Sequence, residues 1–577
     1  MAKISKHPKV NQTQEFIEIA NDFSNPLDVI RESISNSYDA GANSIDITFK
    51  MEKVSGDDEL VLVIKDDGCG MNECELESFF DLGNSTKRNN KDLIGEKGHG
   101  TKVYFNSSNI EVVTKKNGSQ LKAIMKNPLN NLHDGRLPEI EIEEDLCDNT
   151  EHGTTITIRG YNKNRCEKFK PKLLKDYILW FTKHGSVQKA ILMYDKDSVG
   201  NSVNEKEWPV LRLNVFGSEE TINHGHVFPD KKNSIKTLMA AHPGDAGDYY
   251  TNIIVKHGTL KNNPHIQYDA IFSIEGNKAK WGYNDMLKHR GYSAPDGGYT
   301  VQERYGVWIC KDYIPIERKN EWIISKGSEY TRLHAFFNCQ ELRLTANRSS
   351  VENTPSSILD DIQLEIRKIY DEIQLSQAWL DLNDLEGSSK AYNTQEKEKK
   401  MYSRRIKLIK STKIADYKGI RLVEPTQENG VFAMFMQLQS IEPNLFPFVI
   451  LDYNTHEGID VLVKEKDNDE PAVKGKNIYY VEFKNLLTTE YNHSFKNTHS
   501  IVCWDIDPAL TRNEEVIDIS DEKRLLKQIS PLNSSDRTQY FLDAERCSKK
   551  IEVFCLKTYL REVAGIQFRT RTEEDIF

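Results

Sequence analysis

The chain has 577 residues, of which 38% are hydrophobic and 29% are charged, so it is too long for a single hydrophobic core. Its net charge of −11 excludes a uniformly basic protein, and any nucleic-acid-binding surface must be local. The nine cysteines include no CxxC pair, the start lacks an apolar signal segment, and no membrane-spanning apolar run occurs, so we expect a cytoplasmic protein with reduced thiols and no membrane contact.

The first part of the chain alternates predicted helices and strands. Asn25 and Pro26 predict the start of a helix, and Gly41 predicts its end. Between them, apolar residues recur at helical spacing, namely Leu27, Ile30 and Ile34. Alternating or apolar runs predict strands at residues 45–49, 60–64, 110–113 and 154–158. This order is typical of an α/β layer sandwich.

Three polar residues share one face of the predicted helix. Glu32, Asn36 and Asp39 are spaced at i, i+4 and i+7, so their side chains point the same way. A carboxylate and an amide on one helix face suit a hard cation and a water, because Mg²⁺ prefers oxygen ligands. A solvated polar face would show the same spacing.

Two glycine-rich motifs follow. Asp66, Gly68, Gly70 and Met71 lie in a turn directly after a predicted strand, where glycine lets the backbone come close to a ligand; a plain acidic turn is the alternative. A second motif offers backbone N–H groups to an anion, or forms an ordinary surface loop. Its residues are Gly95, Gly98, His99, Gly100 and Thr101, with Lys87 adding positive charge just before them.

The order and spacing of these motifs resemble the GHKL superfamily of gyrase-type topoisomerases, MutL, ninety-kilodalton heat-shock chaperones, MORC proteins and histidine kinases. The resemblance covers about residues 15–160 and implies a Bergerat-type α/β sandwich that binds ATP with Mg²⁺. It implies that Glu32 activates the attacking water, that Asn36 binds Mg²⁺ and that Asp66 recognises the adenine amine. The glycines of the second motif would wrap the phosphates, and Thr154 and Thr155 would support adenine recognition.

The middle of the chain predicts an α/β domain at 166–352, after the ATPase domain at 1–165. A buried strand is expected at 305–310, and isoleucines at helical spacing after Pro355 predict a long helix. MORC- and MutL-like members carry a transducer domain whose loop sends a basic residue to the γ-phosphate. Residues 342–348 are similar to that loop, with Arg348 where the family often has lysine; an ordinary surface arginine is the alternative.

A helical linker is expected at 353–413, followed by a last domain at 414–577. Asp460 lies in one strand of a predicted hairpin, at 458–463, and Glu482 and Lys484 share a face of the other, at 478–484. Two carboxylates and a lysine can hold Mg²⁺ and orient a water for phosphodiester attack. The pattern resembles the restriction-endonuclease-like PD-(D/E)xK nucleases, with Glu428 as the extra helical acid and Ile459 in place of the usual proline. A nuclease-like fold that only binds DNA is the alternative.

These predictions combine into an ATP-gated DNA-processing enzyme that dimerises on ATP binding and cuts DNA, in prokaryotic defence against foreign DNA. A second protein of the same system is a possible partner. The basic stretch 397–413 is a candidate DNA contact or a solvated helix face. Three residues after the hairpin, His493, His499 and Trp504, are expected to pack in the core or lie on the surface. Two alternatives remain: a MORC-like DNA clamp without nuclease activity, and a chaperone-like ATPase with protein clients.

Overall fold

The computed structural model describes residues 10–54, 56–81, 100–195, 208–323, 327–345, 348–454, 460–466, 478–533, 536–545 and 549–575. The chain divides into two compact units, Met1–Thr394 and Gln395–Phe577, and each has a mixed α/β architecture with its own sheets. Across the described ranges, every helix is too short or too polar to cross a membrane.

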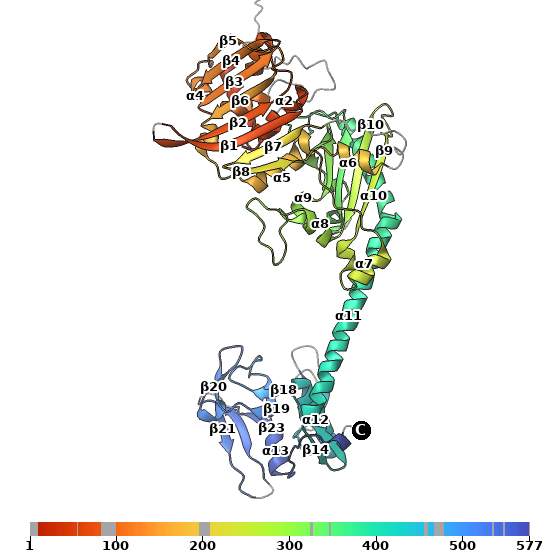
Figure 1. The fold of residues 1–577 in the computed structure, drawn as a ribbon. Helices are drawn as coiled ribbons and strands as arrows, with labels where there is room; N and C mark the ends of the chain where they lie inside the picture. The colour runs from red at the N-terminus through yellow and green to blue at the C-terminus, as the bar shows by residue number, and fades with distance from the viewer. Residues whose placement is uncertain are drawn as a thin grey trace, which may run out of the picture. The chain divides into compact units, whose positions relative to one another are not determined.

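An eight-stranded sheet opens the first unit. Its strands are β1 (Ser44–Val54), β2 (Asp57–Asp66), β3 (Asn109–Lys116), β4 (Ser119–Lys126), β5 (Ile140–Leu146), β6 (Gly153–Arg159), β7 (Val210–Val215) and β8 (Ser218–Ile222). The strand order is β5-β4-β3-β6-β2-β1-β7-β8 (Figure 1). Neighbours are antiparallel except β1 and β7, which pair in parallel. The four strands predicted in this region are therefore confirmed, as β1, β2, β3 and β6.

Helices cover the apolar face of this sheet. They are α1 (Gln12–Asp22), α2 (Asp28–Asp39), α3 (Glu73–Phe80), α4 (Pro128–His133) and α5 (Pro171–Phe181), with a 3-10 turn η1 (Gly100–Phe105). Alternate residues of β1, such as Ile45 and Ile47, share one core with Ile30 and Ile34 of α2. Helix α2 begins two residues after Pro26, because the Asn25 side chain accepts the Leu27 N–H at 3.2 Å and closes a turn first. These residues pack α2 on the apolar face of the sheet.

The boundary expected after residue 165 does not separate two bodies. Strand β7 pairs with β1 from Ser44↔Val210 to Phe49↔Val215, so residues beyond 208 complete the first sheet. This pairing joins segments far apart in the chain, and local periodicity carries no signal for it.

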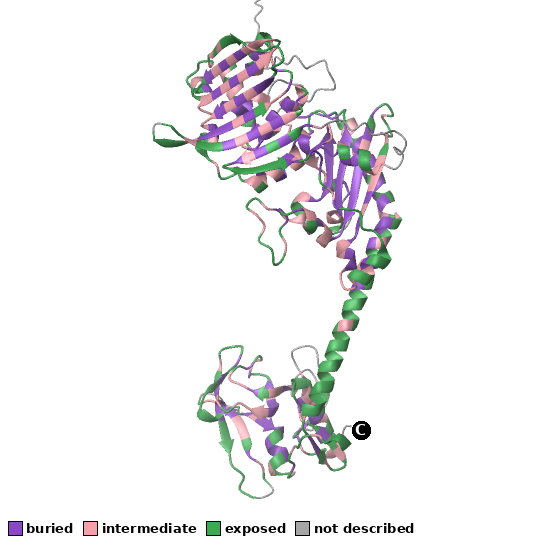
Figure 2. Cartoon of the chain, viewed as in Figure 1, coloured by how far each residue is buried: buried purple, intermediate pink, exposed green. Residues whose placement is uncertain are grey.

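A five-stranded sheet forms the rest of the first unit. Its strands are β9 (Thr251–Thr259), β10 (Gln267–Glu275), β11 (Gly306–Lys311), β12 (Ile314–Arg318) and β13 (Leu333–Cys339), in the order β12-β11-β13-β10-β9. Four short helices accompany it: α6 (Gln188–Tyr194), α7 (Ile235–Ala241), α8 (Asn277–Tyr283) and α9 (Val301–Arg304). All residues of β11 and β13 are buried (Figure 2), which confirms the strand predicted at 305–310.

Two long helices follow, α10 (Ser356–Gln374) and α11 (Gln377–Ser411). The isoleucines of α10 pack in one core with β10, β11 and β13. The first turns of α11 join the same core through Trp379 and Leu382, whereas its later part is exposed (Figure 2). The expected linker of residues 353–413 is thus divided, because the apolar face of α10 needs a partner and finds it in the first unit.

The second unit contains a hairpin of β14 (Ile414–Tyr417) and β15 (Ile420–Val423) and a second eight-stranded sheet. The sheet strands are β16 (Phe448–Tyr453), β17 (Val461–Glu465), β18 (Tyr479–Leu487), β19 (Thr498–Ile506), β20 (Glu515–Ile517), β21 (Lys523–Ile529), β22 (Gln539–Asp543) and β23 (Ile551–Cys555). Their order is β16-β17-β18-β19-β23-β22-β21-β20, with β18, β19 and β23 parallel. Helices α12 (Glu428–Ile441) and α13 (Leu556–Glu562) pack on one face. The antiparallel β17–β18 pair confirms the predicted hairpin.

Candidate functional site

Helix α2 presents the first candidate residues. Glu32 is 9% exposed, and a side-chain carbon added at Gly100 would lie 2.1 Å from Glu32 Oε2, so the backbone at the start of η1 adjoins this carboxylate. One turn further along, Asn36 Nδ2 is buried and has no hydrogen-bond partner within the described part of the chain. The Glu32 carboxylate and the side-chain oxygen of Asn36, which lie one turn apart on α2, are groups of the kind that suit a hydrated cation and a nucleophilic water.

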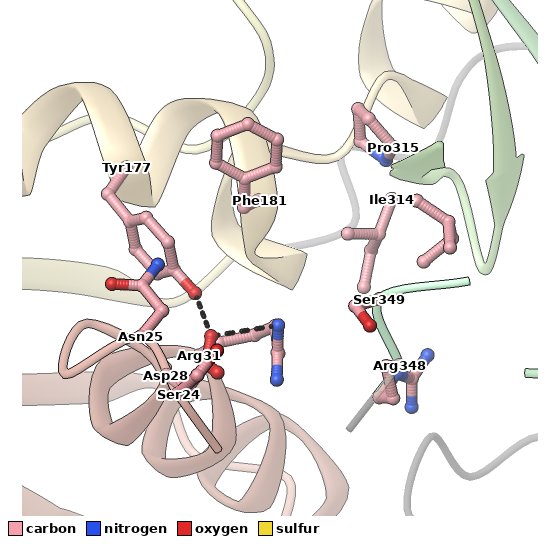
Figure 3. A pocket seen from close by; sticks show the side chains of 11 residues that line it. Ser24, Asn25, Asp28, Arg31, Tyr177, Phe181, Ile314, Pro315, Arg348 and Ser349 are labelled. Atoms are coloured by element: carbon pink, nitrogen blue, oxygen red, sulfur yellow. Dashed lines mark hydrogen bonds and ion pairs between the residues drawn. The ribbon is translucent and has the colours of Figure 1, made fainter. Parts of the chain in front are cut away.

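Glu32 belongs to an ion-pair network with Arg31 and Asp28 on the same helix. Arg31 Nε donates to Glu32 Oε1 at 3.2 Å, and Arg31 Nη1 lies 3.0 Å from Asp28 Oδ1. The Tyr177 hydroxyl, on α5, donates to the same Asp28 oxygen at 2.7 Å. Figure 3 shows Asp28 between Arg31 and Tyr177. Burial raises the pKa of Asp28. Sequence reasoning missed Arg31, although its place next to Glu32 was visible.

The two aspartates at the end of β2 have different partners. Asp66 Oδ1 accepts the Gly68 N–H at 2.9 Å, and Asp66 Oδ2 accepts the Ser37 hydroxyl of α2 at 3.3 Å. Burial raises the pKa of Asp66. Asp67 Oδ1 instead accepts the N–H groups of Asn43 and Ser44 at 2.7 and 2.8 Å, which secures the start of β1. Asp66 thus contacts α2, the helix that carries Glu32, whereas Asp67 contacts the backbone at the start of β1.

Glycine is required in this turn for steric reasons. At Gly70, where φ is +66°, an added side-chain carbon would lie 2.0 Å from the Lys115 carbonyl oxygen. At Gly153, where φ is +127°, it would lie 2.4 Å from the Asp66 carbonyl oxygen. The next residue, Met71, donates its N–H to Thr114 Oγ1 at 2.8 Å. Close packing on three strands therefore fixes the backbone of the turn around Asp66.

A row of polar residues crosses the sheet beside Asp66. Strand register aligns Asp66 with Thr154 and Thr154 with Thr114, and the two threonine hydroxyls lie 3.1 Å apart. Thr155 pairs with the exposed Lys65 and lies on the opposite face of β6. The expected role of Thr155 in adenine recognition is thus not supported, because alternate residues of a strand point to opposite faces.

The structure describes only the last part of the second glycine motif, from Gly100 onward. Lys87, Gly95, Gly98 and His99 lie outside the described residues. Thr101 Oγ1 donates to the Phe79 carbonyl at 2.7 Å, so its hydroxyl faces the end of α3 rather than a ligand.

Lys102 anchors the same segment. Its ammonium donates to the Phe79 carbonyl at 3.3 Å and also to the Asp81 carbonyl, and burial lowers its pKa to about 7. This lysine therefore stabilises the end of α3.

Arg348 lies near the start of α2. Its Nη2 lies 2.9 Å from Asp312 Oδ2 in the β11–β12 turn, and its φ of +54° marks a tight loop. Arg348 lines a cavity of about 240 Å³ together with Asp28 and Arg31 (Figure 3). The structure therefore brings the predicted transducer arginine to the helix that carries Glu32, although some 300 residues separate them in the chain.

The second unit brings four predicted residues together. Lys484 Nζ lies 3.1 Å from Glu482 Oε1 and 3.2 Å from Glu428 Oε1 at the start of α12. Asp460 Oδ2, just before β17, accepts the Phe483 N–H at 2.8 Å, which holds Asp460 beside Glu482. Ile459 lies outside the described residues. Three separate segments thus converge on one carboxylate–lysine cluster.

Glu482 is the most buried member of this cluster, at 3% exposure. Burial and then the charge of Asp460 raise its pKa to about 7. Its Oε2 is buried without a hydrogen-bond partner in the described ranges, as expected of an oxygen that meets a cation. No three His, Cys, Asp or Glu side chains in those ranges are arranged to hold a metal ion. A cation here would therefore rely on two carboxylates and on water, as Mg²⁺ often does.

The three residues after the hairpin have different positions. Trp504 is 5% exposed and packs in the core, as expected, and His499 Nε2 lies 3.5 Å from Glu465 Oε1. His493 Nε2, however, lies 3.0 Å from Glu482 Oε1, so His493 belongs to the cluster and is not only a packing residue. Sequence reasoning missed it because the loop that carries it has no fixed spacing to Glu482.

Comparison with known proteins adds one finding. A protein-family profile described as "Histidine kinase-, DNA gyrase B-, and HSP90-like ATPase" matches residues 24–154. A comparison with curated proteins found no match. The matched range contains Glu32, Asn36, Asp66 and Thr154, and it ends before Arg348 and before the cluster of the second unit.

Proposed function

Residues 24–154 form an ATPase domain of the GHKL type, and from this premise we propose that the chain is an ATP-dependent DNA-processing protein. ATP binding closes a dimer of the ATPase domains, and this closure gates a DNA nuclease in the second unit. The nuclease acts on foreign DNA in a prokaryotic cell, and a second protein of the same system triggers this activity. The convergence of Glu428, Asp460, Glu482 and Lys484 is the observation that carries the nuclease proposal.

In the ATPase site, Glu32 accepts a proton from the water that attacks the γ-phosphorus, and the bond from that phosphorus to the β–γ bridging oxygen breaks. Asn36 contributes its side-chain oxygen to the hydrated Mg²⁺ of the nucleotide. Asp66 Oδ2 accepts the adenine amine, and Arg348 neutralises charge on the γ-phosphate. The burial of Glu32 and the position of Asn36 one turn further along α2 support these roles.

In the second unit, Asp460 and Glu482 hold Mg²⁺, which supplies Lewis-acid activation of the phosphodiester when bound. Lys484 stabilises charge that develops on the phosphate as a water attacks the phosphorus and the bond to the leaving oxygen breaks. Glu428 orients Lys484 through their 3.2 Å ion pair. DNA reaches the cluster along the basic residues of α11, most of which are exposed.

A DNA clamp without nuclease activity is the second candidate. It is favoured by one observation, that the described ranges contain no group of three metal-ligating side chains. In that case the second unit would bind DNA and leave it intact. A chaperone-like ATPase is the third reading, and it requires that the protein fail to bind DNA even at low salt, where phosphate contacts are strongest.

The test is plasmid cleavage with Mg²⁺, with and without ATP, by the wild-type protein, Glu32→Ala and Lys484→Ala. Lys527→Ala, at an exposed position of β21, is the matched lysine control. We expect Lys484→Ala to abolish cutting, Glu32→Ala to change its dependence on ATP, and Lys527→Ala to cut normally. If none of these proteins, including the wild type, cuts the plasmid with or without ATP, while the wild type still hydrolyses ATP, the nuclease proposal is wrong. The DNA clamp then takes its place.

A further inference from the structure

His493 occupies a defined position in the carboxylate–lysine cluster. It lies in the connection between β18 and β19, and its Nε2 is 3.0 Å from Glu482 Oε1. The same oxygen lies 3.1 Å from Lys484 Nζ. The other carboxylate oxygen, Glu482 Oε2, is buried and has no partner within the described ranges. Glu482 Oε1 thus has two partners, whereas Oε2 has none among the described residues.

Ring contacts and hydrogen bonds hold the loop that carries His493 in a defined conformation. The imidazole contacts two tyrosine rings, with ring centroids 6.3 Å from Tyr480 and 6.0 Å from Tyr491. The Tyr480 hydroxyl donates to the Ser494 carbonyl at 2.6 Å, and the Tyr491 N–H donates to the Ile517 carbonyl at 2.8 Å. These contacts fix the backbone on both sides of His493, so the imidazole meets Glu482 without first having to be ordered.

We propose that His493 is a positioning residue of the second-unit site: its Nε2–H holds Glu482 Oε1 so that Oε2 faces a divalent cation. This inference rests on the proposed function of that site. In the ionised form of Glu482, which is the form that binds a cation, the carboxylate only accepts hydrogen bonds, so the proton of the imidazole must be on Nε2. A nitrogen that carries this proton cannot also bind the cation, and His493 therefore acts through Glu482.

The chain offers a conservative variant and a matched control. In His493→Gln, the side-chain amide nitrogen is the same number of bonds from Cα as imidazole Nε2, so it can donate the same hydrogen bond. His493→Ala removes the donor. His499, also a partly buried histidine of this sheet, lies near Glu465 and not near Glu482, so His499→Ala controls for the loss of an imidazole.

The experiment measures Mn²⁺ binding to the full-length, nucleotide-free protein by electron paramagnetic resonance, with Glu482→Gln to identify the signal of this site. We expect Glu482→Gln to abolish this binding and His493→Ala to weaken it about 10- to 100-fold, the usual effect of removing a group that orients a ligand. His493→Gln should restore most of the affinity, and His499→Ala should bind like the wild type. Thermal unfolding of each variant verifies that it is folded.

Three outcomes would overturn the proposal. If His493→Ala binds Mn²⁺ as tightly as the wild type while Glu482→Gln does not bind, His493 has no positioning role although the cation site stands. If His493→Gln is as weak as His493→Ala, the donated hydrogen bond is not the cause. If Glu482→Gln binds like the wild type, the cation site itself is absent, and the nuclease proposal fails together with the role of His493.

Discussion

At the scale of single residues, neighbours of the same type have separate roles in this protein. Asp66 accepts a hydrogen bond from Ser37 on the helix that carries Glu32, whereas Asp67 binds two backbone N–H groups at the start of β1. Thr154 lies beside Asp66, whereas Thr155 lies on the other face of the sheet. Strand alternation and turn geometry make these distinctions, so the motif alone indicates the region and the structure selects the residue.

The aspartate pair provides a residue-scale prediction. We expect Asp66→Asn to weaken ATP binding by about tenfold or more, because the exocyclic amine of adenine then loses a charged acceptor. Asp67→Asn should bind ATP nearly normally but unfold at a lower temperature, because its two backbone hydrogen bonds weaken. Calorimetric titration with ATP and thermal unfolding separate the two effects. Equal loss of affinity in both variants would contradict the distinct roles assigned here.

At the scale of elements, α2 and the loop of Arg348 meet across a cavity of about 240 Å³. Local spacing predicted the helix and its polar face, because both follow the 3.6-residue period. The position of Arg348 had no such signal and was inferred from resemblance. The structure adds the ion pair between Arg348 and Asp312, which holds the arginine on its own sheet.

This ion pair leads to an element-scale prediction. We expect Arg348→Ala to reduce kcat for ATP hydrolysis by about tenfold or more, since the positive charge that we propose acts on the γ-phosphate is lost. Asp312→Asn should raise kcat, because Arg348 no longer has to leave a carboxylate to reach the nucleotide. Asparagine tolerates the φ of +56° at this position, so the turn should be retained. Steady-state ATPase assays measure both changes, and identical kcat values in both variants and the wild type would rule out a role for the pair.

At the scale of the whole molecule, α11 is the covalent link between two compact units. It starts in the core of the first unit and continues past the division after Thr394 to Ser411. A continuous helix transmits rotation and displacement better than a flexible chain does. The link is therefore the natural place to test whether ATP binding in one unit controls the cluster in the other.

We expect a flexible Gly-Ser insertion after Thr394 to abolish the effect of ATP on plasmid cleavage while both ATP hydrolysis and basal cleavage persist. A helix-forming insertion of equal length, rich in alanine, glutamate and lysine, is the matched control and should retain more of the coupling. Cleavage rates with and without ATP measure the effect. Full retention of ATP dependence with the flexible insertion would show that the coupling does not pass through α11.

The sequence by itself determined the features that depend on local order: the amphipathic period of α2 and α10, the alternation of β1 and β6, and the spacing of glycine with Glu32, Asn36 and Asp66. Only the tertiary structure decided which strands pair over long distances, as β7 does with β1, and where α10 is buried. It also decided which side chains meet, such as Arg31 with Glu32 and His493 with Glu482. The physical reason is that periodicity along the chain reports which face of an element is apolar, whereas contacts between distant segments depend on how those faces pack in three dimensions.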